Sequence, residues 1–586
     1  MTDWKYRIRM DLVAGLLALL LAALAARLAL LHVGANDALR RRIEQTRRYE
    51  DRIPEPRGRI LDRHGNLLAL DLAMKNVIAD PREIIASGHL RFTGMQLARV
   101  LQLDPAMVMG RLNRPHRRFE YIKQFVPEDT AEQIRRMQLQ GVRFDDVCVR
   151  HYPQGDLVCH VIGFVNLENV GSAGIEQRLD AYLRGQPGLR VGEKDGGGRE
   201  MYDRRVLDIA PQQGADVYLT IDQNLQYMVE KALDAAMAEQ RTRGAWAIVQ
   251  RVRTGEILAM ASRPSYDLNQ FRAATQERML NRATGHVFEP GSTFKVAMIA
   301  AALNEKTVTP DQVFDCENGC WFYKGRPLRD YHPNGRLTVA DVLKKSSNIG
   351  AAKISLTMDE KTVERYLRAF GFGRPSGIEL PGEEGGILRD CSRWTSLSLS
   401  RIAMGHEVSV TALQMLNMLC AVANDGFLVR PTIIRRMVDA DGRTIMETKP
   451  EFVARPIRED TARLMRKLLV RVTEEGGTGT RARVAGYSVA GKTGTAQKAV
   501  PGGYSDRANY SSFMGFLPAE SPDSIAIMVV LDEPQLSQRT GGVVAAPVFQ
   551  EIARQAVRYL DIPPDVQTDA PTVASRENEP DRGPRL

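Results

Sequence analysis

Ser292 and Lys295 are spaced so that they can act together in nucleophilic catalysis. They introduce the run 293–303, which is rich in Ala and apolar at helical spacing, so the sequence predicts a buried helix. Ser292 then lies in the first turn, near unpaired N–H groups and the positive end of the helix dipole, with Lys295 one turn along the same face. A lysine whose pKa is lowered by burial can take the proton of a serine hydroxyl. Alone, the pair is more typical of an N-cap serine and a surface lysine.

Two later patterns change that balance. Ser346-x-Asn348 falls where one predicted helix ends and another begins, and Lys492–Thr495 reads Lys-Thr-Gly-Thr within a predicted strand. Each pattern alone is typical of a solvated turn or a strand edge. The three patterns in this order, each on a suitable helix, turn or strand, jointly indicate serine-based acyl transfer.

The residue types fit acyl transfer from a peptide that ends in a free carboxylate. We expect Ser292 to attack the carbonyl carbon, with Lys295 as its base. The Ser346 hydroxyl and the Lys492 ammonium would pass a proton to the leaving amine. Asn348 would orient Lys295 and bind the substrate amide.

The Lys-Thr-Gly-Thr strand is expected to bind the substrate itself. The hydroxyls of Thr493 and Thr495 would hold the terminal carboxylate. Gly494 has no Cβ and would let the substrate backbone lie against the strand. The backbone N–H groups of Ser292 and Thr495 would form an oxyanion hole.

Composition places the chain among multidomain globular proteins. Its 586 residues are too many for one ordinary core, so two or three domains are expected. The net charge of +9 comes from scattered Lys and Arg, without the basic, aromatic-interleaved run of a nucleic-acid groove, so no nucleic-acid partner is expected. Six cysteines are too few to hold the fold together by disulfides.

The N-terminus contains a candidate membrane span. A basic tail, residues 1–11, precedes the apolar stretch 12–33, which Arg27 interrupts near its outer end. A cleaved signal peptide with Ala23–Ala25 at its cleavage site is the alternative, although apolar residues continue past that point. Basic residues flank both ends, but long domains cross a membrane largely regardless of charge. We therefore expect residues 1–11 in the cytoplasm and the bulk of the chain outside.

Residues 34–213 are predicted to form a stalk and a non-catalytic domain. Residues 34–52 are charged and are predicted to be a stalk, helical to about Glu50. A mixed α/β pedestal over 53–213 begins with two short strands around a His64–Asn66 turn, and its Gly188–Gly198 segment is predicted to be a flexible crossing. His151, His160, Cys148 and Cys159 lack the spacing of metal ligands, so no metal site is predicted.

Residues 214–562 are predicted to form the catalytic domain, and 563–586 a disordered tail. Asp222 should cap a helix that ends near Arg241, and the stretch from the Ser292 helix to about Met437 should be mostly helical. A final helix should bury Phe549, Ile552, Ala556 and Leu560. The expected strands are 215–221, 246–252, 256–262, 487–496, 510–517 and 524–531.

The chain resembles the class B penicillin-binding proteins, which are peptidoglycan D,D-transpeptidases, and most of all the FtsI (cell-division) type. The resemblance covers nearly the whole chain. It departs from the usual motifs at His64, where the family usually has Asn, and at Ser347, where the Ser-x-Asn motif is also written with Asp. Beyond the three motifs, it is carried by Arg57–Gly65, Gly171–Glu176, Leu219–Asp222, Pro264–Asn269 and Asn424–Gly426.

This resemblance implies a single-pass anchor in the cytoplasmic membrane, an elongated pedestal, and a transpeptidase domain outside the membrane with an antiparallel sheet flanked by helices. It implies no metal and no organic cofactor. The implied substrates are peptidoglycan stem peptides, a D-Ala-D-Ala donor and an amine acceptor, and β-lactams would acylate the serine. The implied partners are a SEDS-type glycosyltransferase and division proteins in the membrane.

Other functions stay open at this point. β-Lactam hydrolysis or carboxypeptidation would use the same serine, but the sequence offers no assignable Glu for a deacylating water, and a pedestal suits a polymer-building enzyme better. A membrane-tethered scaffold for a glycan polymerase and an elongation-type transpeptidase are the remaining alternatives. Cys316 and Cys320 either pair across a tight loop or stay free, and pairing of either with Cys391 is also open.

Overall fold

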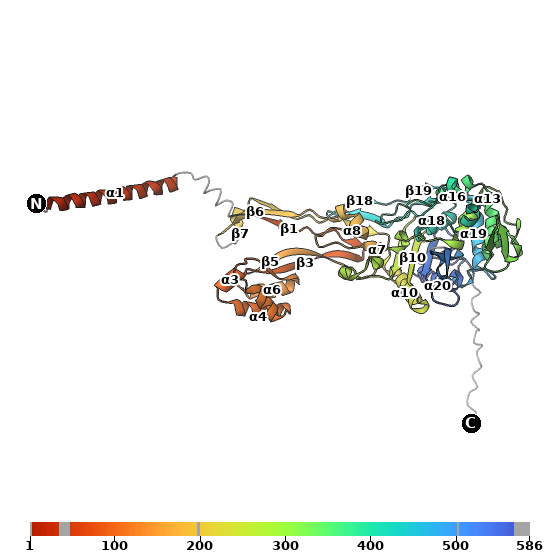
Figure 1. Cartoon of the computed structure of the whole chain (residues 1–586), viewed down its shortest axis with the longest axis horizontal. Coiled ribbons are helices and arrows are strands. Elements are labelled where there is room, and N and C mark those ends of the chain that lie inside the picture. The colour runs from red at the N-terminus through yellow and green to blue at the C-terminus, as the bar shows by residue number, and fades with distance from the viewer. Residues whose placement is uncertain (1–2, 34–46, 196–199, 501–502, 568–586) are drawn as a thin grey trace, which may run out of the picture. The chain divides into compact units, whose positions relative to one another are not determined.

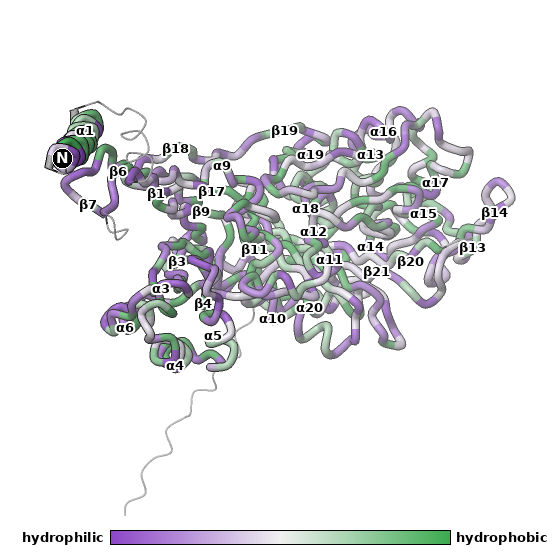
Figure 2. Tube along the Cα trace, turned by 60° about the vertical axis from the view of Figure 1, so that its left-hand side comes forward, coloured by the Kyte–Doolittle hydropathy of each residue, from purple (hydrophilic) through white to green (hydrophobic). Residues whose placement is uncertain are grey.

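The computed structural model describes residues 3–33, 47–195, 200–500 and 503–567 (Figure 1). Helix α1 (Asp3–Val33) contains the predicted span and is coloured mostly as hydrophobic in Figure 2. Within the described part of the chain, it is the one helix long and apolar enough to cross a membrane. Residues 34–46 of the predicted stalk and 568–586 of the predicted tail lie outside the described residues. The last stalk residues form strand β1 (Arg48–Ile53), so the helix predicted to reach Glu50 is wrong there.

The chain divides into two compact units that interleave along the sequence. The first unit holds residues 1–56, 73–148 and 185–213, and the second holds 57–72, 149–184 and 214–586. Residues of the predicted pedestal, 53–213, therefore contribute to both units.

Two groups of strands build the first unit. β6 (Gly188–Lys194) pairs antiparallel with β1, β7 (Glu200–Met201) and β8 (Leu207–Ile209). The flexible crossing predicted over Gly188–Gly198 is therefore wrong over 188–194, and residues 196–198 lie outside the described residues. The later residues of β3 (Leu67–Ala79) pair with β4 (Glu120–Pro127), and β3 also pairs with β5 (Val142–His151). Four helices pack on this second group of strands and share a separate hydrophobic core with it: α3 (Pro81–Ala86), α4 (Leu90–Leu101), α5 (Pro105–Leu112) and α6 (Glu128–Arg136).

A sheet with helices on both faces forms the centre of the second unit. Among the described residues it has five antiparallel strands in the order β11-β10-β22-β21-β20. One face packs on α10 (Gln223–Gln240), capped by Asp222 as predicted, and on α20 (Gly541–Tyr559), and the other packs on α18 (Ala412–Ala423). This arrangement confirms the predicted sheet flanked by helices. The strands are β10 (Gly244–Arg251), β11 (Ile257–Arg263), β20 (Ala490–Val500), β21 (Gly503–Leu517) and β22 (Ile525–Asp532).

The region between the Ser292 helix and Met437 is helical only in part. Two small antiparallel pairs interrupt it: β12 (Val313–Asp315) with β15 (Arg336–Thr338), and β13 (Cys320–Tyr323) with β14 (Arg326–Arg329). The prediction of a mostly helical stretch is therefore wrong over residues 313–338. Besides α18, the α-helices of this region and the next are α13 (Lys295–Asn304), α14 (Val339–Lys345), α15 (Asn348–Ser355), α16 (Glu360–Ala369), α17 (Ser398–Ile402) and α19 (Glu459–Thr473).

A second sheet of this unit includes a strand from the Arg57–Gly65 motif. β2 (Ile60–Leu61) pairs with β3 around the predicted His64–Asn66 turn, and it runs parallel to β9 (Asp216–Leu219). β9 pairs in turn with β17 (Ile434–Val438), whose other neighbour is β18 (Thr444–Glu447).

A buried ionic cluster joins two of the motifs that carry the resemblance. The Arg57 guanidinium donates to Glu176 at 2.9 Å and to Asp180 at 2.8 Å. Arg150 donates to the other oxygen of Glu176 at 2.6 Å and to Asp71 at 3.0 Å. The side chains of Arg57 and Glu176 are fully buried. Each buried charge of this cluster thus faces an opposite charge, as burial requires.

Candidate active site

The structure brings the three sequence motifs together around one ammonium group. Ser292 lies in a 3₁₀ turn, Gly291–Phe294, that leads into α13, and Lys295 is the first residue of α13. Ser346 lies between α14 and α15, Asn348 begins α15, and Lys492 lies on β20. Residues separated by two hundred positions in the sequence thus meet at one point.

The Lys295 ammonium is placed to serve Ser292. Its Nζ donates to the Ser292 Oγ at 3.1 Å and to the Asn348 Oδ1 at 2.7 Å. It also donates to the backbone carbonyl of Ser346 at 2.6 Å, and the Ser346 Oγ lies at 3.3 Å. All these contacts are with neutral oxygens, and no carboxylate among the described residues forms a hydrogen bond with this buried nitrogen.

Ser346 connects the two lysines. Lys492 Nζ donates to the Ser346 Oγ at 2.8 Å, and it also donates to the carbonyl of Thr493 at 3.1 Å and to the Thr493 hydroxyl at 3.5 Å. Ser346 has a φ of +61°, which is costly for a residue other than glycine. This left-handed turn between two helices presents both the hydroxyl and the carbonyl of Ser346 to the lysines.

Burial makes Lys295 a base near neutral pH. The side chain is completely buried, and burial lowers the pKa of Lys295 to about 7, while the negative charge of Asp330 acts in the opposite direction. Burial and the neighbouring Lys295 also lower the pKa of Lys492 far below its ordinary value. A lysine with a pKa of about 7 is about half neutral at pH 7, and its neutral form can accept the serine proton.

Thr493 and Thr495 of β20, which were expected to bind substrate, have different hydrogen-bond partners. Thr495 is exposed, and its Oγ1 accepts a hydrogen bond from the Gly541 N–H at 3.1 Å, so its own proton points elsewhere. Thr493 Oγ1 contacts the Thr478 hydroxyl at 2.9 Å. Thr495 can therefore donate to a carboxylate beside β20.

Gly494 is required by the chain itself. A Cβ at Gly494 would lie 2.3 Å from the Ser512 Oγ, 3.0 Å from the Thr293 Cγ2 and 3.2 Å from the Pro290 carbonyl oxygen. The absent side chain therefore lets β20 approach the Ser292 turn. This packing is one reason for the glycine, and the expected approach of a substrate backbone to Gly494 stays a prediction.

Sequence reasoning missed the carboxylate of Asp330, which follows β14. It accepts hydrogen bonds from the backbone N–H groups of Asn348 and Ile349 and from the Ser347 hydroxyl. A single carboxylate in a turn belongs to no motif with a characteristic spacing. Only a prediction of the paired strands β13 and β14 could have suggested its position.

Glu289 fixes the other side of the Ser292 turn. Its carboxylate accepts from the Glu407 N–H at 3.0 Å, contacts the His406 Nδ1 at 2.9 Å, and accepts from the Tyr504 hydroxyl at 3.2 Å. Tyr504 belongs to β21, so the turn before the serine is tied both to the main sheet and to the 405–407 loop.

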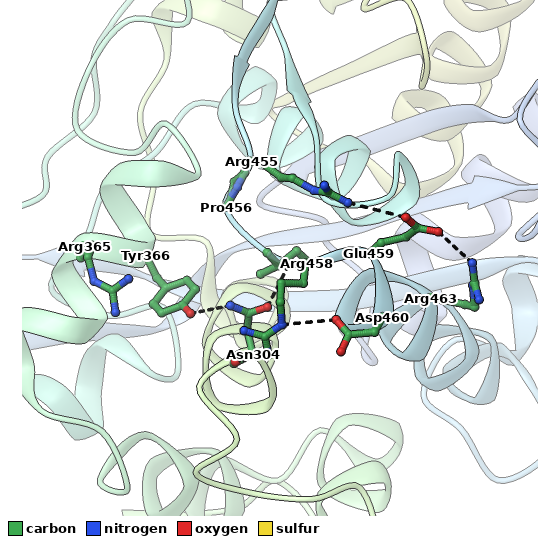
Figure 3. Close-up of a pocket in the computed structure, with 10 residues that line it drawn as sticks. Asn304, Arg365, Tyr366, Arg455, Pro456, Arg458, Glu459, Asp460 and Arg463 are labelled. Atoms are coloured by element: carbon green, nitrogen blue, oxygen red, sulfur yellow. Dashed lines mark hydrogen bonds and ion pairs between the residues drawn. The ribbon is translucent and has the colours of Figure 1, made fainter.

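A cavity of about 660 Å³ lies at the far end of α13 and is distinct from this site (Figure 3). There Asn304 donates to the Tyr366 hydroxyl at 2.6 Å and accepts from the Arg458 N–H at 2.9 Å and from the Thr461 hydroxyl at 3.0 Å. The arginines that line the cavity pair with carboxylates or carbonyl groups, for example Arg463 with Glu459. The network anchors the C-terminal end of the helix that begins with Lys295.

The cysteines whose pairing was open are free thiols in this structure: Cys316, Cys320 and Cys391. Cys316 is buried, and its Sγ lies 3.4 Å from the Ser347 hydroxyl. His160 and Cys159 are also buried, and His160 contacts the carbonyl of Arg278 at 2.7 Å.

Two family models match the chain. The penicillin-binding protein transpeptidase domain matches residues 245–554, and the penicillin-binding protein dimerisation domain matches residues 52–219. The first match covers more than half of the chain and contains all three motifs.

Curated and solved relatives agree with these matches. The chain is 32% identical to peptidoglycan D,D-transpeptidase FtsI of Escherichia coli (strain K12) over 96% of this chain and 93% of that protein. It is 33% identical to the stage V sporulation protein D of Bacillus subtilis (strain 168), over 87% of this chain and 79% of that protein.

Among solved structures, penicillin-binding protein 3 of Mycobacterium tuberculosis complexed with aztreonam is similar, with a TM-score of 0.69 and 27% identity over 88% of this chain and 98% of that chain. Domain content, sequence and fold thus agree. The chain belongs to the class B penicillin-binding proteins of the FtsI type.

Proposed function

We propose that the protein is an acyl-serine D,D-transpeptidase that crosslinks peptidoglycan stem peptides outside the cytoplasmic membrane. The carrying observation is the contact of the buried Lys295 Nζ with the Ser292 Oγ, at 3.1 Å, within a ring of neutral acceptors. Nucleophile, base and base-orienting groups are thereby assembled before substrate arrives.

Acylation follows from this geometry. The Ser292 Oγ attacks the carbonyl carbon of the D-Ala-D-Ala bond while Lys295 takes its proton, and the N–H groups of Ser292 and Thr495 hold the developing oxyanion. The proton then passes through Ser346, which contacts both lysines, to the amine of the leaving D-Ala. The product is an ester between Ser292 and the donor peptide.

Transfer runs through the same groups in reverse. An amine of a second stem peptide loses its proton toward Ser346 and Lys295 and attacks the ester carbonyl, and Ser292 leaves with its proton restored. In the preceding acylation, Thr493 and Thr495 hold the terminal carboxylate of the D-Ala that leaves. A β-lactam carries an equivalent carbonyl and carboxylate and acylates the same serine.

The cellular setting is part of the proposal. Helix α1 acts as an uncleaved anchor with the N-terminus in the cytoplasm, and the likeness to FtsI favours a role in septal synthesis beside a SEDS-type glycosyltransferase. In cells that depend on this chain alone, Ser292→Ala should cause filamentation. Rounded cells would instead favour the elongation-type role.

The test of the chemistry is labelling of the full-length, detergent-solubilised protein with a fluorescent penicillin. The wild type should form a stable covalent band, and Ser292→Ala should form none. Ser392→Ala is the matched control, because its hydroxyl donates only to the nearby Asp390 in the described structure, at 2.6 Å, and it should label normally. A folded wild type that does not label would refute acyl-serine chemistry, and rapid turnover of penicillin would indicate a hydrolase instead.

A further inference from the structure

Asp330 lies in the loop after β14, outside the three motifs, and its carboxylate has four donors. Oδ1 accepts from the Asn348 N–H at 2.5 Å and from the Ile349 N–H at 3.0 Å. Oδ2 accepts from the Ser347 hydroxyl at 2.7 Å and from the Asn334 side-chain amide at 3.2 Å. A half-buried carboxylate with this many donors is fixed in position.

Three of these donors form the beginning of α15, and α15 begins with the residue that holds the base. Asn348 gives its backbone N–H to Asp330 and its side-chain Oδ1 to Lys295 at 2.7 Å. Its Nδ2 donates to the carbonyl of Arg329, the neighbour of Asp330, at 2.8 Å. The loop after β14 thus fixes both the backbone and the side chain of Asn348, and through them the Lys295 Nζ.

Asp330 also acts on the charge balance of the site. The charged groups facing Lys295 are Lys492 from β20 and Asp330 from this loop. Burial lowers the pKa of Lys295, whereas the negative charge of Asp330 raises it. Removal of that charge should therefore lower the pKa of Lys295 further.

The middle motif explains why this carboxylate comes from elsewhere. The Ser-x-Asn motif is also written with Asp at its central position, where this chain has Ser347. Ser347 is the N-cap of α15, accepts from the Gly350 N–H at 2.9 Å, and turns its own proton to Asp330. The carboxylate that the motif lacks is therefore supplied by the loop after β14.

We propose that Asp330 is a positioning residue for acyl transfer, which seats the Ser346–Asn348 turn and supplies its missing carboxylate. The inference rests on the proposed function. Asp330 contacts neither Ser292 nor Lys295 in the hydrogen bonds described above, so its effect passes through Asn348 and through its charge.

The test compares rates of acylation by a fluorescent penicillin across pH 5–9 for the full-length wild type and Asp330→Asn. The amide keeps the shape but offers one acceptor oxygen and no charge. Acylation at the pH plateau should fall roughly tenfold to a hundredfold, because the base is less well placed. The acidic limb of the profile should also move to lower pH by about one unit, because Lys295 loses a nearby negative charge. A purely structural role would lower the rate without moving the limb.

Two further variants separate positioning from folding. Asp330→Asn combined with Ser347→Asp returns a carboxylate to the turn and should restore the wild-type limb and much of the rate. Asp359→Asn removes a comparable capping carboxylate, which accepts from the Thr362 N–H and hydroxyl at the start of α16, and should change neither.

The outcomes are distinct. An Asp330→Asn profile identical to that of an acylated wild type overturns the inference alone. The inference also fails if Asp330→Asn lowers the acylation rate without moving the acidic limb of the pH profile, and if adding Ser347→Asp does not restore that rate. A wild type that is never acylated overturns the proposed function and this inference together. A shifted limb with rescue by Ser347→Asp supports the inference.

Discussion

Two of the places where the second unit buries charge are built on opposite rules. In the cluster of Arg57 and Arg150, each guanidinium meets carboxylates at 2.6–3.0 Å. Around Lys295 and Lys492, two ammonium groups are completely buried among hydroxyl, amide and carbonyl oxygens. The first arrangement favours the charged form of its side chains, whereas the second favours the neutral form of its lysines.

The difference distinguishes a structural from a chemical use of buried charge. Carboxylates beside Arg150 raise the pKa of its guanidinium, so its proton is held more tightly. Burial lowers the pKa of Lys295 to about 7, so its proton is free to leave and return at neutral pH. Paired charges fix a fold, whereas an unpaired buried lysine is a base.

The largest effect should come from Lys295→Met. Acylation by a penicillin should fall by about a hundredfold to ten-thousandfold, which is the usual contribution of a general base. The midpoint of thermal unfolding should stay the same or rise, because an uncompensated buried cation is removed. Stopped-flow acylation and calorimetry on the same preparation measure both. A marked drop in the unfolding midpoint would show that Lys295 stabilises the fold, and the contrast between the two clusters would fail.

Arg150→Met should give the opposite result. Stability should fall by about 3–5 kcal/mol, because Glu176 and Asp71 lose a buried partner, while the folded fraction acylates normally. Denaturant unfolding checks the first point and active-site titration the second. Arg184→Met is the control: it removes a partly exposed pair with Asp180, which is worth at most about 1 kcal/mol. Equal losses from both variants would contradict a special role for the buried cluster.

The pH dependence of acylation should sharpen the comparison. Lys295 must be neutral to accept a proton, and its pKa is lowered to about 7. The rate should therefore fall about tenfold per pH unit below 7 and level off above it. Lys295→Met should retain no such limb. A rate limb near the ordinary lysine pKa would mean that burial does not tune this base.

The smallest effect should come from Gly494→Ala. The added methyl meets Ser512, Thr293 and the Pro290 carbonyl, so β20 must shift away from the Ser292 turn at a cost of about 1–3 kcal/mol. Acylation should fall with it, because the turn carries the nucleophile. Gly110→Ala in α5, where a Cβ has open space, should be neutral or slightly stabilising. Unchanged acylation in Gly494→Ala would show that the turn tolerates the shift.

Sequence patterns were sufficient for the parts that local chemistry determines. The Asp222 cap, the strand pair around Thr254 and Gly255, and the buried helix after Ser292 all form as predicted. Each has a local cause: a capping carboxylate, a glycine turn, or an apolar run at helical spacing.

The parts that the sequence concealed depend on partners far along the chain. Residues 188–194 look flexible because they contain glycines and charges, yet β1 and β8 pair with them on either side. The left-handed φ of Ser346 and the role of Asp330 likewise depend on contacts between separate loops. Neither the hydrophobic periodicity of the sequence nor the spacing of its motifs indicates such contacts.

Helix α13 begins with Lys295 and ends with Asn304 in the anchored network of Figure 3. Ten residues of helix span about 15 Å, so that network sets the axial position of the base from roughly that distance. Selection for survival under a β-lactam can therefore act on Asn304 or Tyr366, adjusting reactivity toward the drug while every residue that touches the drug is conserved.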